Sequence, residues 1–328
     1  MMLQTTFSTL LSAFVVLISC AVVIPSILKI SAERSLYDQV DERKIHRGRI
    51  SRLGGLAFMP AIVFAVAFTI AVDNLVYGGG IFPASASSAT LICLGLCSVV
   101  AIYLVGMADD MIGVRYSAKF VVQIFAATCL TISGTTIGSL NGCLGIWELH
   151  PLAAFLLTAL VVVFVVNAVN LIDGLDGLAG GICLLISLYD GIIFYNSGNP
   201  VFAVISFAVA GTLLAYLYFN LFGNPEKNSK IFMGDTGSLT LGIVVSFLCV
   251  VMANEHLRIG TLTPDPLAMA FAPLLIPCLD VLRVFFGRMR RGKSPFLPDK
   301  THIHHLLLAR GLSQRATLVT ILLAMVLL

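Results

Sequence analysis

The stretch LAAFLLTALVVVFVVNAVNL at residues 152–171 is followed by IDGLDG at 172–177 and by LAGGICLLISLYDGIIFYN at 178–196. Each flanking run is close to the ~20 apolar residues that an α-helix needs to cross a bilayer. The short segment between them holds Asp173 and Asp176, and a carboxylate at mid-bilayer costs roughly 3 kcal/mol. The stretch therefore predicts two membrane spans joined by an acidic turn at the membrane surface.

Composition extends this prediction to the whole chain. Of the 328 residues, 58% are hydrophobic and 11% are charged, whereas soluble domains are about 25% charged. This excludes a soluble globular protein. Apolar runs of spanning length lie at 8–30, 53–76, 87–108, 119–139, 152–171, 178–196, 201–222, 236–253 and 267–287, with a partial run at 316–328. We predict an all-α integral membrane protein, a polytopic bundle of about ten transmembrane helices forming one domain over residues 1–328.

The basic residues distinguish the two membrane faces. The first of them, Lys29, comes at the end of the first apolar run and not before it. This is the reverse of a secretory signal peptide and predicts an uncleaved span with the N-terminus outside. If each successive run crosses the membrane from this outer N-terminus, 19 of the 20 Lys and Arg residues lie on the opposite side. The exception on the outer side is Arg258. The opposite face is therefore expected to be cytoplasmic.

Four polar stretches fall on this cytoplasmic side, although they played no part in assigning it. They are Ala108-Asp109-Asp110, Asn167 to Gly177, Gly234 to Ser238, and Asp299 to His305 in the loop 288–315. Distant parts of the chain are thus expected to converge at one face of one bundle.

The pair Asp109 and Asp110 ends the third run, and Lys119 begins the fourth. Adjacent helical residues point about 100° apart, so the two carboxylates can serve different partners, one a metal or phosphate and the other a proton. The simpler explanation is a helix end with solvated charges.

The second stretch combines amides, carboxylates and glycines. Asn167 and Asn170 are three apart and share a helix face, and the glycines of the following turn allow Asp173 and Asp176 to fold back. Such oxygen donors suit a hydrated magnesium ion and a diphosphate. The alternative is a polar reverse turn without a ligand.

The third stretch leads into the eighth run. Thr236 or Ser238 is a candidate helix cap, and the N-terminal N–H groups are expected to face an anion, with Asp235 binding a bridging metal. Upstream, Phe232 can stack on a base and Asn220 can pair with uracil. Simple capping, an interfacial aromatic and a polar helix end are the competing explanations.

The last stretch is basic and rich in histidine. A zinc site is conceivable from the His-Ile-His-His spacing, but no Cys or fourth ligand of the usual spacing stands out. We expect contact with phosphate or sugar instead; the alternative is a basic membrane anchor. The candidates are Arg291, Asp299, His302, His304 and His305. Asp280, inside the ninth run near Arg283, can simply pair with that arginine, and a catalytic role for it is left open.

Taken together, the four stretches resemble the signatures of the polyprenyl-phosphate N-acetylhexosamine-1-phosphate transferases, in order, over residues 30–315. The form His302-Ile303-His304-His305 is similar to the branch that begins O-antigen, enterobacterial common antigen or teichoic acid linkage units. The resemblance implies transfer of N-acetylhexosamine-1-phosphate, most often GlcNAc-1-phosphate, from a UDP-sugar to undecaprenyl phosphate, giving the lipid-diphospho-sugar and UMP. It also implies Mg²⁺ or Mn²⁺, a bacterial inner membrane, and a bundle of ten or eleven spans that is often a homodimer. No nucleic-acid partner is expected. Because the last run stops early, we expect a C-terminal span to be missing.

The resemblance also implies roles for individual residues. Asp235 would be the principal metal ligand, with help from Asn170. Asp109 would be the base or nucleophile, with Asp110 as its partner near the metal. Four residues would hold the uridine diphosphate end: Asp173, Asp176, Asn220 and Phe232. We expect further substrate contacts from Asn167, Lys119, Asp299, Arg291 and the three histidines.

Two other classes of function remain to be weighed. An ion-coupled transporter also places Asp and Asn in a membrane, but its sites usually lie at mid-bilayer between internal repeats, and no repeat is evident here. A structural scaffold without catalysis is the third reading. We favour the enzyme, acting by direct displacement, because a phosphate monoester is already largely ionised near neutral pH.

Overall fold

The computed structural model describes residues 2–34, 36, 50–81, 85–254, 263–292, 294 and 301–327. Within these ranges the chain is helical apart from connecting segments and two isolated β-bridges, Ser51 with Ile231 and Ser139 with Glu148. The helices are α1 (Met2–Glu33), α2 (Phe58–Tyr77), α3 (Ala86–Ile112), α4 (Tyr116–Ile132), α5 (Pro151–Ile172), α6 (Leu178–Asn196), α7 (Pro200–Phe222), α8 (Gly234–Ala253), α9 (Pro266–Phe271), α10 (Leu275–Arg290), α11 (Ile303–Ala309) and α12 (Gln314–Leu327). Short 3₁₀ turns are η1 (Leu53–Ala57), η2 (Cys143–Gly145), η3 (Pro225–Lys227) and η4 (Ala272–Leu274).

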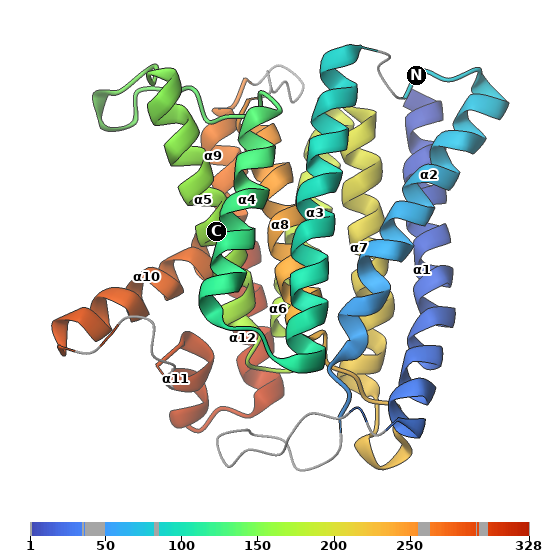
Figure 1. The fold of residues 1–328 in the computed structure, drawn as a ribbon, viewed down its shortest axis with the longest axis vertical. Helices are drawn as coiled ribbons and strands as arrows, with labels where there is room; N and C mark the ends of the chain where they lie inside the picture. The colour runs from blue at the N-terminus through green and yellow to red at the C-terminus, as the bar shows by residue number, and fades with distance from the viewer. Residues whose placement is uncertain are drawn as a thin grey trace.

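Helix α8 forms the centre of the bundle. It packs against α3 and α5, while α7 packs between α1 and α6 (Figure 1). Every residue from Thr236 to Met252 is buried. A helix that is apolar on all sides is expected in the interior of a helical protein, and the sequence of α8 has this character. The first turn of α8 is therefore held at a defined place among its neighbours.

The predicted fold class is confirmed. Eight helical segments of the described chain are long and apolar enough to cross a membrane. Each backbone N–H and C=O inside such a helix has an internal partner, which a bilayer requires. The protein is a multi-pass, all-α membrane protein. The expected number of ten spans is not confirmed, because α4 and α12 are shorter than a full span.

The ninth predicted span differs from expectation. The run 267–287 is not one straight helix; it consists of α9, η4 and α10. Pro273 lies in η4 and Pro277 in the first turn of α10, and a proline lacks the N–H that would continue the helical ladder. In Figure 1, α10 is inclined away from the upright helices and α11 lies below it. The expected loop 288–315 thus contains the end of α10 and all of α11.

Glycines allow three segments to meet at the start of α8. A Cβ on Gly106 of α3 would lie 2.7 Å from the Cα of Thr236, and a Cβ on Gly55 of η1 would overlap the backbone of Gly237. Small residues permit helix backbones to approach closely in membranes. Because α3 and η1 touch α8 at backbone distance, the end of α3 is directed at the first turn of α8.

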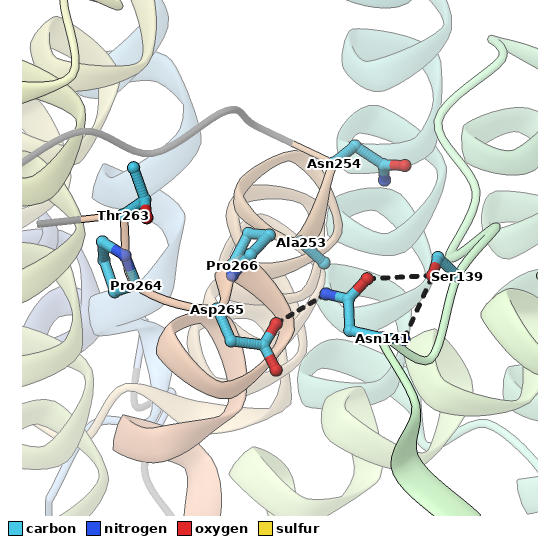
Figure 2. A pocket seen from close by; sticks show the side chains of 8 residues that line it. All are labelled: Ser139, Asn141, Ala253, Asn254, Thr263, Pro264, Asp265 and Pro266. Atoms are coloured by element: carbon cyan, nitrogen blue, oxygen red, sulfur yellow. Dashed lines mark hydrogen bonds between the residues drawn. The ribbon is translucent and has the colours of Figure 1, made fainter. Parts of the chain in front are cut away.

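The opposite end of α8 carries a polar pocket. It is lined by Ser139, Asn141, Ala253, Asn254, Thr263, Pro264, Asp265 and Pro266 (Figure 2). The amide Nδ2 of Asn141 donates to Oδ1 of Asp265 at 2.6 Å, and the same oxygen accepts from the N–H of Leu267 at 3.0 Å. Asp265 therefore caps α9 and joins it to the loop after α4.

Candidate active site

Asp110 binds the first turn of α8 from the neighbouring helix α3. Its Oδ1 accepts from the backbone N–H of Asp235 at 2.9 Å. Its Oδ2 accepts from the N–H and the hydroxyl of Thr236 at 2.8 and 2.6 Å. A carboxylate is a favourable partner for the unpaired N–H groups at a helix N-terminus. The expectation that these N–H groups face a substrate anion is wrong for these two, because Asp110 already occupies them.

Asp109 and Asp235 share one cation. The Nζ of Lys119 donates to Oδ2 of Asp109 at 3.1 Å and to Oδ2 of Asp235 at 2.8 Å. The other oxygen of Asp109 accepts from the N–H of Val114 at 2.7 Å. Three helices, α3, α4 and α8, therefore contribute one charged side chain each to a partly buried cluster.

Asn170 joins this cluster from α5. Its Nδ2 donates to Oδ1 of Asp235 at 3.3 Å and to the hydroxyl of Ser238 at 2.9 Å. Asn167 lies one turn earlier but faces α4, where its Nδ2 donates to Oε1 of Gln123 at 2.7 Å. The structure thus places Asn170 in the cluster and Asn167 in a pair with Gln123, a residue that sequence reasoning missed.

The acidic turn between α5 and α6 lies beside the cluster. Asp176 forms an ion pair with Lys230. Burial, followed by repulsion from Asp235, Asp176 and Asp110, raises the pKa of Asp173 to about 7. Excess negative charge is therefore concentrated where a cation or a cationic group would be stabilised.

Asn220 holds the acidic turn in place. Its Oδ1 accepts from the N–H of Gly177 at 2.7 Å, and its Nδ2 donates to the carbonyl of Ile231 at 2.9 Å. Nearby, the backbone N–H of Phe232 donates to the carbonyl of Ser51 at 2.8 Å. Asn220 is buried with both ends on backbone, so it connects the turn to the segment leading into α8.

The histidines approach the acidic turn from α11. His304 is 1% exposed, and neither ring nitrogen has a hydrogen-bond partner among the described residues. Burial, followed by the nearby His305 and His302, lowers the pKa of His304 to about 4. A Cβ on Gly174 would lie 2.5 Å from its Nε2, so the ring packs directly on the turn. The His-Ile-His-His motif and the Asp173–Asp176 turn are therefore in contact.

A basic cavity of about 570 Å³ lies between α10 and α11. It is lined by Arg283, Val284, Phe286, Gly287, Arg290, Arg291, Thr301 and Leu306. The predicted Arg291 thus lines this cavity rather than the acidic cluster. Asp299, the remaining candidate, lies outside the described residues. The roles assigned to all these side chains remain predictions.

The cluster fits a divalent cation in its chemistry. Among the described residues, no group of three His, Cys, Asp or Glu side chains forms a ready ligand set. Asp109 and Asp235 nevertheless hold one positive charge between them, the ammonium of Lys119, with the amide of Asn170 alongside. Hard oxygen ligands, few in number and completed by water or phosphate, are typical of magnesium sites.

Comparison with known proteins finds similar chains. Residues 91–253 match the family described as Glycosyl transferase family 4. The chain is 31% identical over 327 residues to the undecaprenyl-phosphate alpha-N-acetylglucosaminyl 1-phosphate transferase of Salmonella typhi, covering 99% of this chain and 82% of that relative. It is 29% identical over 303 residues to the protein of the same name from Escherichia coli K12, covering 92% and 76%.

A third relative has a similar name and a similar level of identity. The decaprenyl-phosphate N-acetylglucosaminephosphotransferase of Mycolicibacterium smegmatis is 32% identical over 297 residues, covering 85% of this chain and 70% of that relative. These matches confirm the resemblance that the motifs indicated. The alignments run across the acidic stretches and nearly the full length of the bundle, and so the chain belongs to glycosyl transferase family 4, as a membrane-embedded phosphoglycosyltransferase enzyme.

Proposed function

We propose that the protein transfers N-acetylglucosamine-1-phosphate from UDP-N-acetylglucosamine to undecaprenyl phosphate at the cytoplasmic face of a bacterial inner membrane. The observation that carries the proposal is the meeting of the family's acidic stretches at one end of the bundle, around Asp109, Lys119 and Asp235. The names of the relatives supply the lipid acceptor and the sugar phosphate. The distribution of Lys and Arg supports the cytoplasmic placement and the outer N-terminus.

The reaction is a phosphoryl-group substitution. An oxygen of the lipid phosphate attacks the phosphorus that carries the sugar, and the bond from that phosphorus to the UMP oxygen breaks, with UMP leaving with the electron pair. Lys119 and Lys230 place positive charge beside the acidic cluster and the acidic turn, where they can neutralise the phosphates of the donor. Holding both substrates in line at one membrane surface lowers the reaction barrier further, because the reacting groups are already close together and oriented.

A divalent ion, Mg²⁺ or Mn²⁺, would be held by Asp235 and Asp109 with Asn170 beside them, and it would stabilise the leaving UMP. Asp110 keeps Asp235 in position because its carboxylate accepts from the backbone N–H of Asp235. The acidic turn and the α11 histidines lie next to each other, and we place the uridine diphosphate and sugar there. The arginines of the basic cavity provide bidentate donors for phosphate.

Direct displacement is the proposed mechanism. The lipid phosphate is largely ionised near pH 7, since its second pKa is about 6, and it needs little help from a base. One oxygen of Asp109 accepts from Val114 and the other from Lys119, so the carboxylate is engaged on both sides. A phosphorylated Asp109 trapped during turnover would overturn this mechanism.

The test is transfer of radiolabel from UDP-N-acetylglucosamine to undecaprenyl phosphate by the purified protein in detergent. We expect labelled lipid and UMP in equal amounts, and loss of both when EDTA is added. A panel of UDP-hexosamines identifies the preferred sugar. Failure to form labelled lipid with any of them would contradict the proposal.

The same preparation separates the alternatives. An ion-coupled transporter would move ions into proteoliposomes without consuming UDP-sugar, and a scaffold would do neither. The comparisons give no support to the transporter. The expected homodimer is also a proposal, and light scattering of the detergent-solubilised protein tests it.

A further inference from the structure

Asp280 is a buried carboxylate of α10 that the proposed reaction does not use. Only 5% of it is exposed. Its Oδ1 accepts from Nη2 of Arg283 at 2.6 Å and from the backbone N–H of Ile303 at 2.9 Å. Its Oδ2 lies 2.8 Å from Nδ1 of His302. Both oxygens are thus occupied, and two of the three partners belong to the start of α11.

The pairing with Arg283 does not by itself account for this burial. The arginine side chain is 46% exposed, and an ion pair so open to solvent contributes little. His302 is only 5% exposed, and the contact with Ile303 is also partly buried. Arg283 in addition donates to the carbonyl of Thr301 at 2.6 Å. The whole arrangement therefore anchors residues 301–303 to α10.

The contact with Asp280 also orients the His302 ring. A carboxylate at Nδ1 favours the proton on that nitrogen and leaves Nε2 directed away from it. The ring lies parallel to His304, with 6.0 Å between centroids and 9° between planes. His302, at the N-cap of α11, thus lies alongside His304 in the first turn of that helix.

His304 lies at the far side of this connection, on the acidic turn. It is buried against Gly174, and both its ring nitrogens lack partners among the described residues. A buried polar ring without hydrogen bonds is costly, and a missing ligand is one physical explanation. Here the ring lies next to the turn where the nucleotide-sugar is proposed to bind.

We propose that Asp280 is a positioning residue for the sugar-phosphate transfer. It holds His302 and the first turn of α11, so that His304 presents its ring nitrogens to the substrate beside the Asp173–Asp176 turn. This inference rests on the proposed function.

The principal test compares Asp280→Asn with Asp265→Asn. Both changes replace a hydrogen-bonded carboxylate by an amide of the same size, but Asp265 lines the pocket of Figure 2, at the C-terminal end of α8. Loss of the outer partner of a metal-binding histidine typically costs 10–100-fold, and we expect an effect of the same order for a histidine that contacts substrate. We expect kcat/KM to fall by about that factor in Asp280→Asn, with an unchanged melting temperature, and to stay at the wild-type value in Asp265→Asn.

A double-mutant cycle distinguishes positioning from simple anchoring. If Asp280 acts through His302, the variant carrying both Asp280→Asn and His302→Ala should be no slower than His302→Ala alone. Additive losses, wild-type kinetics in Asp280→Asn, or a fall in activity that only follows a fall in melting temperature would each overturn the proposal.

Labelling with diethylpyrocarbonate, read by mass spectrometry, provides a measurement that does not depend on turnover. In Asp280→Asn we expect faster modification of His304, while the exposed His150 at the start of α5 reacts as before. If the wild-type protein makes no lipid product but this difference appears, the proposed function fails and the positioning stands. If wild-type transfer is normal and neither labelling nor kinetics changes, the positioning fails alone.

Discussion

The carboxylates at the two ends of α8 have different surroundings. At the pocket end, Asp265 binds the amide of Asn141 (Figure 2) and caps α9 through the N–H of Leu267. At the other end, Asp235 shares Lys119 with Asp109 and lies near Asp173, whose pKa is raised by burial and then by the surrounding negative charge. A carboxylate satisfied by neutral donors stabilises the fold. Several carboxylates gathered from different helices leave excess charge, which is typical of functional sites.

The largest expected effect comes from breaking the charged end. Asp235→Asn removes the carboxylate that α8 contributes to the cluster, so we expect lipid-product formation to fall by about 10²–10³-fold. Binding of Mn²⁺, measured by electron paramagnetic resonance, should weaken in parallel. Asp265→Asn is the control. Turnover within about threefold of wild type would show that the two ends are not functionally different.

The second largest effect is expected from adding a methyl group where α3 packs against α8. Gly106→Ala places a methyl group 2.7 Å from the Cα of Thr236, whereas Gly138→Ala meets nothing within 4 Å. Overpacking of this kind costs about 1–3 kcal/mol. We expect a lower melting temperature for Gly106→Ala but not for Gly138→Ala. Transfer should be partly lost in Gly106→Ala because the hydrogen bonds of Asp110 to the first turn of α8 are disturbed. Equal melting temperatures for the two variants would refute the close approach of α3 and α8.

A pH-dependent change of stability should sharpen the comparison. Because the folded-state pKa of Asp173 is raised to about 7 from an ordinary value near 3.9, its ionisation destabilises the fold increasingly from about pH 4 to 7, and fully above that range. In EDTA, Asp173→Asn should raise the melting temperature by a few degrees at pH 8, and this gain should vanish toward pH 4. Differential scanning fluorimetry measures it. A gain that is the same at both pH values would contradict the raised pKa of Asp173.

The smallest effect is expected at the pocket end. Asp265→Asn retains one oxygen for the N–H of Leu267, so its cap on α9 should be weakened by less than the ~1 kcal/mol of a lost cap. Differential scanning fluorimetry should show a melting temperature close to that of the wild type. A large loss of transfer would indicate that the polar pocket has a role in the reaction.

Much of the fold was accessible from the sequence because hydrophobic length is a local property. The runs at 152–171 and 178–196 became α5 and α6 with the acidic turn between them. The break in the ninth run was less evident. A helix can bend at a proline or continue past it, and the neighbours of Pro273 and Pro277 decide which.

The candidate site was predicted in part. The motifs identified Asp109, Asn170 and Asp235, and the structure brings their side chains together. Gln123 was missed because a single amide inside an apolar run has no distinctive spacing. The connection between Asp280 and His302 joins residues 22 apart and depends on where α10 turns. The signal in the sequence was Asp280 itself, an isolated acid inside an apolar run.

The sequence by itself determined that this chain spans a membrane and that its acidic stretches share one face, since apolar length and charge follow from residue order alone. Only the tertiary structure decided that Asp110 binds the backbone of α8 while Asp109 and Asp235 share Lys119. Neighbouring carboxylates have the same chemistry, and their different partners arise from the direction in which packed helices point each side chain.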